Sequence, residues 1–273
     1  MRNLGRRRFL VRGVSLAGVT LLAGPRRLAA QTGPASAGPA DPRLIEDLVA
    51  ANRILVDQGV LDGYGHVSAR HDRDPNRYLM SRSIAPELVT AADIMEYDLD
   101  SNPVDARSRG SYLERFIHGE IYKARPDVKA VVHSHSPSVI PFGVTGVPLR
   151  PLYHMSAFLA AGVPVFDIRT ASGEMTDMLV RNPALGRALA QTLGARAVAL
   201  MRGHGNVVVG ASLPQVVFRG VYTEVNARLQ AQAMALSANV TYLDPEEARK
   251  VEDSLAPTLP RPWELWKRKA VAK

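Results

Sequence analysis

The sequence predicts a single α/β domain whose sheet is mixed and largely antiparallel. At 273 residues, with 46% hydrophobic and 22% charged residues, the chain can bury one full core and has the composition of a globular protein. Segments with the apolar spacing of helices alternate with short β-branched runs. Short turns between several of these runs favour mixed or antiparallel pairing over a purely parallel sheet.

The N-terminal segment has the features of an export signal. Arginines at residues 6–8 precede Phe9-Leu10 and an apolar stretch at residues 13–23, which is too short to cross a bilayer as a helix. This pattern resembles a twin-arginine signal, which exports proteins already folded. We therefore expect residues 1–37 to be signal peptide and linker, cleaved after Ala37 or near Ala30, and the mature protein to be periplasmic and free of the membrane. A disordered basic tail is the alternative.

The positive charge of the chain belongs to this leader. The formal net charge is +8, but residues 1–30 hold seven arginines and no acid, which leaves 27 basic against 26 acidic residues in the remainder. The sequence therefore predicts no nucleic-acid-binding surface on the folded body. The chain contains no cysteine, so any metal must be held by imidazole, carboxylate or water.

The first half of the domain combines one helix pattern with several strand patterns. The domain is expected to begin near Asp41, after an Ala/Gly/Pro/Ser-rich linker. The first helix is predicted from four apolar positions, which are Leu44, Leu48, Ile54 and Leu55. It should run through residue 57 and stop at Gly59. A glycine turn at residues 63–65 leads into an alternating strand that ends at Arg70, and further strands are expected at residues 78–83 and 94–99.

The centre of the chain joins a helix to the strand that carries the main motif. The helix is predicted from Leu113, Phe116, Ile117 and Ile121. Arg125-Pro126 ends the helical pattern, and the β-branched run at residues 128–132 predicts a strand that ends on His133-Ser134-His135. Glu114 is expected to be helical and to lie close to this strand.

The last part of the chain predicts further helices and strands. We expect a short helix within residues 148–166, a helix at 185–193, strands at 197–201 and 207–209, and the longest helix at 213–238. Residues 246–273, with Trp263 and Trp266 among prolines and lysines, predict an irregular C-terminal tail.

Three of the seven histidines are candidates for a metal site. His133 and His135 are two residues apart on a strand and therefore leave the same face. His204 lies between glycines, which let another backbone approach closely. Neutral imidazoles suit a divalent transition metal, although spacing alone leaves separate structural histidines as an equal alternative. For His71, which is flanked by charges, we expect an ordinary satisfied or solvated side chain.

The motifs together resemble the class II aldolase/adducin family. The resemblance covers residues 41–245 and is carried by Glu114, His118, Tyr122, Arg125-Pro126-Asp127, residues 130–135 and Gly203-His204-Gly205. It implies a three-layer α/β/α fold around a mixed, largely antiparallel sheet. It also implies that His133, His135 and His204 bind one divalent ion per subunit, such as zinc or manganese. Glu114 would be the catalytic acid/base, His118 would have a packing role, and the protein would be a homotetramer.

The substrate positions depart from the sugar-phosphate members of that family. Those members bind phosphate with small hydroxyl and glycine residues, whereas Tyr112-Leu113 precede Glu114 here and the loop at residues 81–84 lacks its glycine. Residues 65–70 and 81–83 instead resemble the branch that decarboxylates hydroxylated aromatic or pyridine dicarboxylates. The residues expected to bind substrate are His66, Ser81, Arg82, Ser83 and His154.

The alternatives for these residues are structural. Arg82 can anchor a carboxylate bidentately, but it can equally form a surface ion pair. His66 and His154 can line the pocket, or they can be structural side chains.

The sequence therefore predicts a metal-dependent carbon–carbon lyase that acts on a small molecule. The favoured reaction is decarboxylation of a hydroxylated aromatic or heteroaromatic carboxylate by a retro-aldol-like route, in which a divalent ion stabilises the enolate. The alternatives are an aldolase acting on a sugar or hydroxy-carbonyl compound, and a non-catalytic adducin-like binding module. Retention of three candidate ligands and an acid favours an enzyme.

Overall fold

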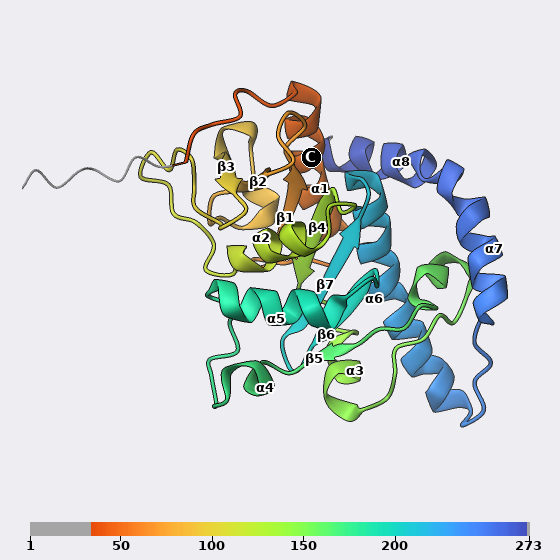
Figure 1. Cartoon of the computed structure of the whole chain (residues 1–273). Coiled ribbons are helices and arrows are strands. Elements are labelled where there is room, and N and C mark those ends of the chain that lie inside the picture. Colours follow the sequence, from red (N-terminus) through yellow and green to blue (C-terminus); the bar gives the residue numbers. More distant parts are fainter. Residues whose placement is uncertain (1–33, 272–273) are drawn as a thin grey trace, which may run out of the picture. The chain divides into compact units, whose positions relative to one another are not determined.

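The structure, a computed structural model, describes residues 34–271, whose arrangement is shown in Figure 1. The twin-arginine signal predicted for the N terminus lies outside the described residues. At the start of the described chain, the backbone N–H of Ala37 donates a 2.8 Å hydrogen bond to Glu96. None of the described helices is long and apolar enough to cross a membrane.

The described residues form a seven-stranded sheet in the order β3-β2-β1-β4-β7-β6-β5. The strands are β1 (His66–Arg70), β2 (Arg77–Ser81), β3 (Ile94–Asp98), β4 (Ala130–Ser134), β5 (Val165–Phe166), β6 (Val198–Met201) and β7 (Gly205–Gly210). Every neighbouring pair is antiparallel except β5 with β6, which is parallel. The prediction of a mixed, largely antiparallel sheet is therefore confirmed.

Helices pack on both faces of this sheet. They are α1 (Pro42–Asp57), α2 (Arg115–Ala124), α3 (Ile140–Thr145), α4 (Ile168–Ser172), α5 (Pro183–Leu193), α6 (Leu213–Leu236), α7 (Pro245–Leu255) and α8 (Pro260–Val271). Short 3₁₀ turns are η1 (Pro86–Leu88), η2 (Ala91–Asp93), η3 (His154–Leu159) and η4 (Ala256–Thr258). Several helices begin with a side-chain cap and a proline, as α6 does after Ser212.

Two hydrophobic cores separate the three layers. Alternate residues of β4 point to opposite faces, so Val132 packs in the core beneath α1, α6 and α8, whereas Val131 packs in the core beneath α2 and α5. Figure 1 shows α2 and α5 on one side of the sheet and α6 on the other. The three-layer α/β/α prediction is confirmed. His133 has the parity of Val131 and therefore lies on the α2 side.

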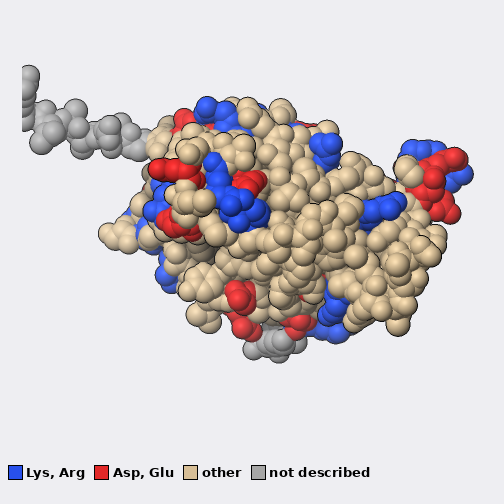
Figure 2. Space-filling model, turned by 90° about the horizontal axis from the view of Figure 1, so that it is seen from below, with Lys and Arg blue, Asp and Glu red and all other residues tan. Residues whose placement is uncertain are grey.

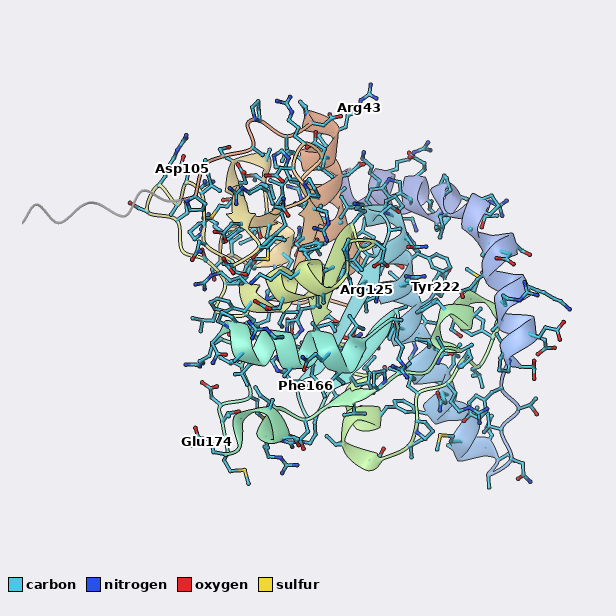
Figure 3. All side chains as sticks on the ribbon, in the orientation of Figure 1. Arg43, Asp105, Arg125, Phe166, Glu174 and Tyr222 are labelled. Carbon is cyan, nitrogen blue, oxygen red and sulfur yellow. The ribbon has the colours of Figure 1, made fainter. Side chains whose placement is uncertain are left out.

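The prediction of an irregular C-terminal tail is wrong, because α7 and α8 occupy most of it. The prolines begin these helices instead of breaking them, since the first helical turn needs no backbone N–H from proline. Asp244 and Glu247 add a capping box to α7. Trp266 is buried, with its ring 6.3 Å from the ring of Tyr222 on α6, labelled in Figure 3. Lys267 of α8 binds Asp47 of α1 at 2.6 Å.

The charged side chains on the face shown in Figure 2 are scattered and of both signs. Basic and acidic groups alternate over this face without a continuous basic patch. This agrees with the near balance of charge in the sequence after the leader.

Candidate functional site

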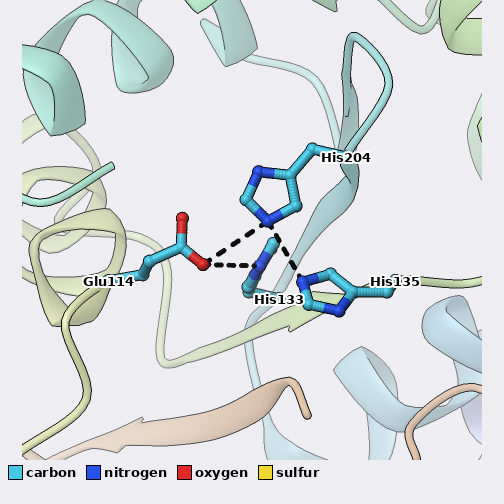
Figure 4. A group of neighbouring side chains, drawn as sticks. All are labelled: Glu114, His133, His135 and His204. Atoms are coloured by element: carbon cyan, nitrogen blue, oxygen red, sulfur yellow. Dashed lines mark hydrogen bonds and ion pairs between the residues drawn. The ribbon is translucent and has the colours of Figure 1, made fainter. Parts of the chain in front are cut away.

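Three histidines converge at one end of β4. His133 is on the strand, His135 follows its last residue, and His204 lies in the turn between β6 and β7. The ring centroids of His133 and His135 are 5.1 Å apart, and those rings lie 5.0 and 4.9 Å from the ring of His204. Figure 4 shows the three rings facing a common point. The sequence prediction that these imidazoles meet is confirmed.

A glycine permits the close approach that brings His204 to this point. The backbone of Gly205 lies so near β4 that a Cβ there would stand 2.0 Å from the carbonyl oxygen of Ser134 and 3.0 Å from the Cα of His135. Any side chain would therefore push the β6–β7 turn away from His135. Gly203, on the other side of His204, has a φ of +62°, a left-handed conformation that glycine adopts without strain.

Glu114 completes the cluster from the start of α2. The helix begins at Arg115 with Glu114 as the residue before its first turn, so the expectation of a helical Glu114 is corrected by one position. Its Oε1 accepts a 2.9 Å hydrogen bond from the backbone N–H of Val180. Its Oε2 lies 3.3 Å from Nε2 of His133 and 3.4 Å from Nε2 of His204. One ligand atom from each of the four residues lies within 4.8 Å of the others.

Backbone carbonyls fix the orientation of two of the rings. Nδ1 of His133 lies 3.1 Å from the carbonyl oxygen of Asn206, and Nδ1 of His204 lies 3.0 Å from that of Met178. A carbonyl only accepts, so each Nδ1 carries a proton, and in the neutral form of each ring Nε2 is the nitrogen with the lone pair. Nε2 of His133 is buried without a hydrogen-bond partner within residues 34–271. In their neutral form the two rings thus turn Nε2 towards the centre of the cluster, as ligands of a cation do.

The donor set fits one divalent transition ion. Nε2 of His204 and Nε2 of His135 are only 3.1 Å apart, a separation at which two lone pairs repel unless a proton or a cation lies between them. Three imidazoles with an adjacent carboxylate match the ligands of catalytic zinc and related ions. The ligands would be His133, His135 and His204, with Glu114 beside them.

Glu114 is ionised in this environment. Burial by itself would raise the pKa of the Glu114 carboxyl, but positive charge at His133 and His204, whose Nε2 atoms face its Oε2, outweighs burial and holds that pKa well below its usual range. Burial and the neighbouring histidines lower the pKa of His135 to about 4. The cluster therefore offers a carboxylate base next to a neutral imidazole.

A cavity of about 320 Å³ opens beside the cluster. Glu114, His135 and His66 contribute its polar side, and Tyr112, Leu113 and neighbouring apolar residues contribute the rest of the wall. Leu113, which the sequence placed in the buried face of a helix, is 58% exposed and lies before α2. Its role is to line the cavity and not the core.

The structure brings some of the predicted substrate-binding residues to this cavity. His66 and Ser83 line it, and Ser81 lies just behind, with its Oγ 3.2 Å from the Tyr112 hydroxyl. Arg82 is not in the wall, and its Nε donates a 2.6 Å hydrogen bond to Asp93. The ion-pair alternative for Arg82 is the arrangement observed.

His154 lies elsewhere in the chain. It is exposed on η3 and borders a separate cavity of about 40 Å³ between η3, α6 and α7. Within one chain the structure therefore does not bring it together with the metal cluster. His71 is buried and satisfied, since its Nε2 lies 3.2 Å from the carbonyl oxygen of Gly38.

Sequence reasoning missed a buried hydrogen-bond chain next to the cavity. Nδ1 of His66 lies 2.7 Å from Nε2 of His118, and Nδ1 of His118 lies 2.6 Å from Oγ of Ser68, which in turn is 2.8 Å from the Tyr122 hydroxyl. Burial lowers the pKa of His118 to about 3, so this ring is neutral. The signal was present: Ser68 shares a strand face with His66, and Tyr122 lies one helical turn from His118.

Comparison with known proteins agrees with this geometry. A family model described as the Class II Aldolase and Adducin N-terminal domain matches residues 46–231. The decarboxylase tropJ of Talaromyces stipitatus is 39% identical over 246 residues, which cover 82% of this chain and 92% of that protein. A 3,4-dihydroxyphthalate decarboxylase of Arthrobacter keyseri is 30% identical over 225 residues, covering 76% of this chain and 86% of its own.

A solved structure shows the same fold. An aldolase II superfamily protein from Pseudomonas syringae superposes with a TM-score of 0.71 at 22% identity, over 85% of this chain and 94% of the other. At that identity the similarity concerns the fold alone.

Replacing any one of the three histidine ligands should remove most of the bound metal. We expect His133→Ala, His135→Ala and His204→Ala each to elute from gel filtration folded but largely metal-free, because two imidazoles bind the ion far more weakly than three. Metal analysis of the eluted protein is the measurement, with the exposed His154→Ala as control. Stoichiometric metal in the triple variant would show that the ion is bound elsewhere.

Gly205→Ala should damage the site through the backbone. The added methyl group meets Ser134 O at 2.0 Å, so we expect a loss of about 1–3 kcal/mol in the free energy of unfolding together with weaker metal binding. Gly63→Ala is the matched control, because nothing lies within 4 Å of its added Cβ. Denaturant titration and metal affinity measure the two effects, and equal stability of the two variants would contradict the close approach.

Proposed function

Because the chain belongs to the class II aldolase/adducin family, we propose that it is a lyase that decarboxylates a hydroxylated aromatic or heteroaromatic carboxylate. One divalent ion would be held by His133, His135 and His204. The observation that carries the proposal is the convergence of three imidazole nitrogens and the Glu114 carboxyl group beside a cavity with aromatic walls. An interaction module has no use for such a cluster.

The wall of the cavity favours an aromatic substrate. Tyr112 and Leu113 stand where small hydroxyl and glycine residues would be needed to surround a phosphate, and both face the cavity. A ring can stack on Tyr112 and contact Leu113, whereas a phosphate would lose its water against these apolar surfaces without gaining hydrogen bonds. Both relatives are decarboxylases, and the name of one, 3,4-dihydroxyphthalate decarboxylase, specifies a hydroxylated aromatic carboxylate.

The chemistry requires a proton to move before carbon dioxide leaves. When bound, the divalent ion supplies Lewis-acid stabilisation of the negative charge that develops on the substrate oxygen. Glu114 takes the proton of the ring hydroxyl and delivers it to the ring carbon that bears the carboxylate. The carbon–carbon bond then breaks, carbon dioxide departs, and the electron pair returns through the ring to that oxygen as an enolate. The N–H of Val180 holds the carboxylate in place through its other oxygen.

Aldol cleavage of a hydroxy-carbonyl compound is the second candidate. It uses the same groups, because breaking a bond next to a carbonyl also leaves an enolate. The two reactions differ in their products: decarboxylation releases carbon dioxide, and aldol cleavage releases an aldehyde or ketone. A screen of the metal-loaded protein against hydroxylated aromatic carboxylates and sugar phosphates, with both products recorded, distinguishes them. Efficient cleavage of a sugar phosphate, without carbon dioxide from any aromatic acid, would overturn the proposal.

Glu114→Gln should separate metal binding from catalysis. The amide keeps the shape and can still accept the Val180 hydrogen bond, but it cannot take a proton. We therefore expect metal content near that of the unmodified protein and turnover lower by about two to four orders of magnitude, the usual contribution of a positioned acid/base group. Carbon dioxide release under saturating substrate measures the effect. Full activity in this variant would rule out Glu114 as the base.

A further inference from the structure

A chain of hydrogen bonds runs from the interior of the α2 layer to the wall of the cavity. It links Tyr122 and His118 on α2 to Ser68 and His66 on β1, with heavy-atom distances of 2.8, 2.6 and 2.7 Å in that order. Tyr122, Ser68 and His118 are at most 1% exposed. Only His66, at the end of the chain, reaches the cavity.

The hydrogens of this chain can run in two directions. In the first, each group donates towards the cavity: Tyr122 to Ser68, Ser68 to Nδ1 of His118, and Nε2 of His118 to Nδ1 of His66. In the second, every bond is reversed, and the hydrogen of the Tyr122 hydroxyl has no acceptor in the described part of the chain. A buried O–H without an acceptor costs more free energy than a buried hydroxyl oxygen that accepts no hydrogen bond, which is the state of Tyr122 in the first direction. The first direction is therefore favoured.

The favoured direction determines which nitrogen of His66 carries its proton. Nδ1 of His66 accepts from His118, so a neutral His66 must carry its hydrogen on Nε2. Nε2 has no protein partner among residues 34–271, which leaves it as the polar atom that His66 offers to the cavity. The ring itself is held in place, because it also packs against Tyr112 and His133, with ring centroids 4.6 and 5.1 Å away.

We propose that Tyr122, Ser68 and His118 hold His66 in the tautomer protonated on Nε2, so that His66 donates a hydrogen bond to an anionic oxygen of the substrate. The inference rests on the proposed function for the identity of that oxygen, a carboxylate or ring oxygen of a hydroxylated aromatic acid. His66 is a binding residue in this account. The other three are positioning residues, because they act only through His66.

The rest of the cavity explains why such a donor is needed. Glu114 is a carboxylate, and the bare imidazole nitrogens are acceptors, so these groups repel an anionic substrate unless a cation lies between them. Arg82, the cationic residue that the sequence offered for carboxylate binding, is paired with Asp93 away from the wall. A fixed neutral N–H on His66, beside the cluster, supplies recognition in its place.

The tautomer can be read directly by nuclear magnetic resonance. The full mature protein, with ¹⁵N in its histidine rings, is measured both metal-free and loaded with diamagnetic zinc, and the His66 signals are identified by their loss in His66→Leu. We expect a bare Nδ1 and a protonated Nε2. A protonated Nδ1, or protons on both nitrogens, would overturn the inference. In Ser68→Ala, nothing selects one direction of the chain, so the Nε2 shift should move towards the value of a bare nitrogen.

Binding of 2-hydroxybenzoate to the zinc-loaded protein tests recognition. Loss of a hydrogen bond to a charged group corresponds to about ten-fold weaker binding, so we expect that increase in Kd for His66→Leu and a smaller increase for Ser68→Ala. For a substrate that is turned over, Ser68→Ala should raise KM more than it lowers kcat. The matched control is Ser101→Ala, which removes an equally buried hydroxyl. This hydroxyl accepts a 3.0 Å hydrogen bond from Tyr78 and makes none with Tyr122, Ser68, His118 or His66.

The outcomes separate this inference from the proposed function. Equal effects of Ser68→Ala and Ser101→Ala would show general packing and overturn the positioning role. In another outcome, the unmodified protein releases carbon dioxide while His66→Leu binds 2-hydroxybenzoate with an unchanged Kd. That result would overturn recognition by His66 and leave the proposed function intact. An Nε2-protonated His66 in a protein that decarboxylates no aromatic acid would support the positioning chain and reject the function.

Discussion

The pairing of β4 between β1 and β7 determines where the histidines of the site lie. The register sets His133 opposite His66 on one side and opposite Val207 on the other. A slip of one residue would turn His133 to the other face and exchange it for Ser134. The close contact of Gly205 with the Ser134 carbonyl then brings the β6–β7 turn, and with it His204, within reach. Backbone pairing alone thus places His133 and His204, two of the ligands.

Backbone groups around the cluster orient its side chains as much as the contacts within the cluster do. The Asn206 and Met178 carbonyls orient two rings, and the Val180 N–H orients the carboxylate. These three partners are backbone groups in segments remote from α2 and β4 in the sequence. Their rigidity keeps the bare nitrogens converged in spite of mutual repulsion, which a site for a tightly held cation requires.

Sequence predicted the parts of the site that depend on local periodicity. The strand period of residues 128–135 and the glycines around His204 made convergent imidazoles one of two equal interpretations, with Glu114 expected nearby. The family resemblance then decided for the metal site and gave Glu114 its catalytic role. The partners that orient the rings could not be predicted, since every residue has a carbonyl and only the tertiary fold selects which one faces His204. Arg82 shows the same limit. A guanidinium can bind any carboxylate, and only the tertiary fold shows that its partner is Asp93 of η2 and not a substrate.

The packing of the last helix on the first has a consequence for the order in which the protein is completed. Trp263 and Trp266 of α8 belong to the same core as α1, and Lys267 binds Asp47, a residue made 220 positions earlier. Until α8 has been synthesised, the apolar surface of α1 that Trp263 and Trp266 cover remains exposed. The core on this side of the sheet is therefore completed only once α8 has been made, so its final packing forms late and cannot accompany synthesis of the N-terminal half.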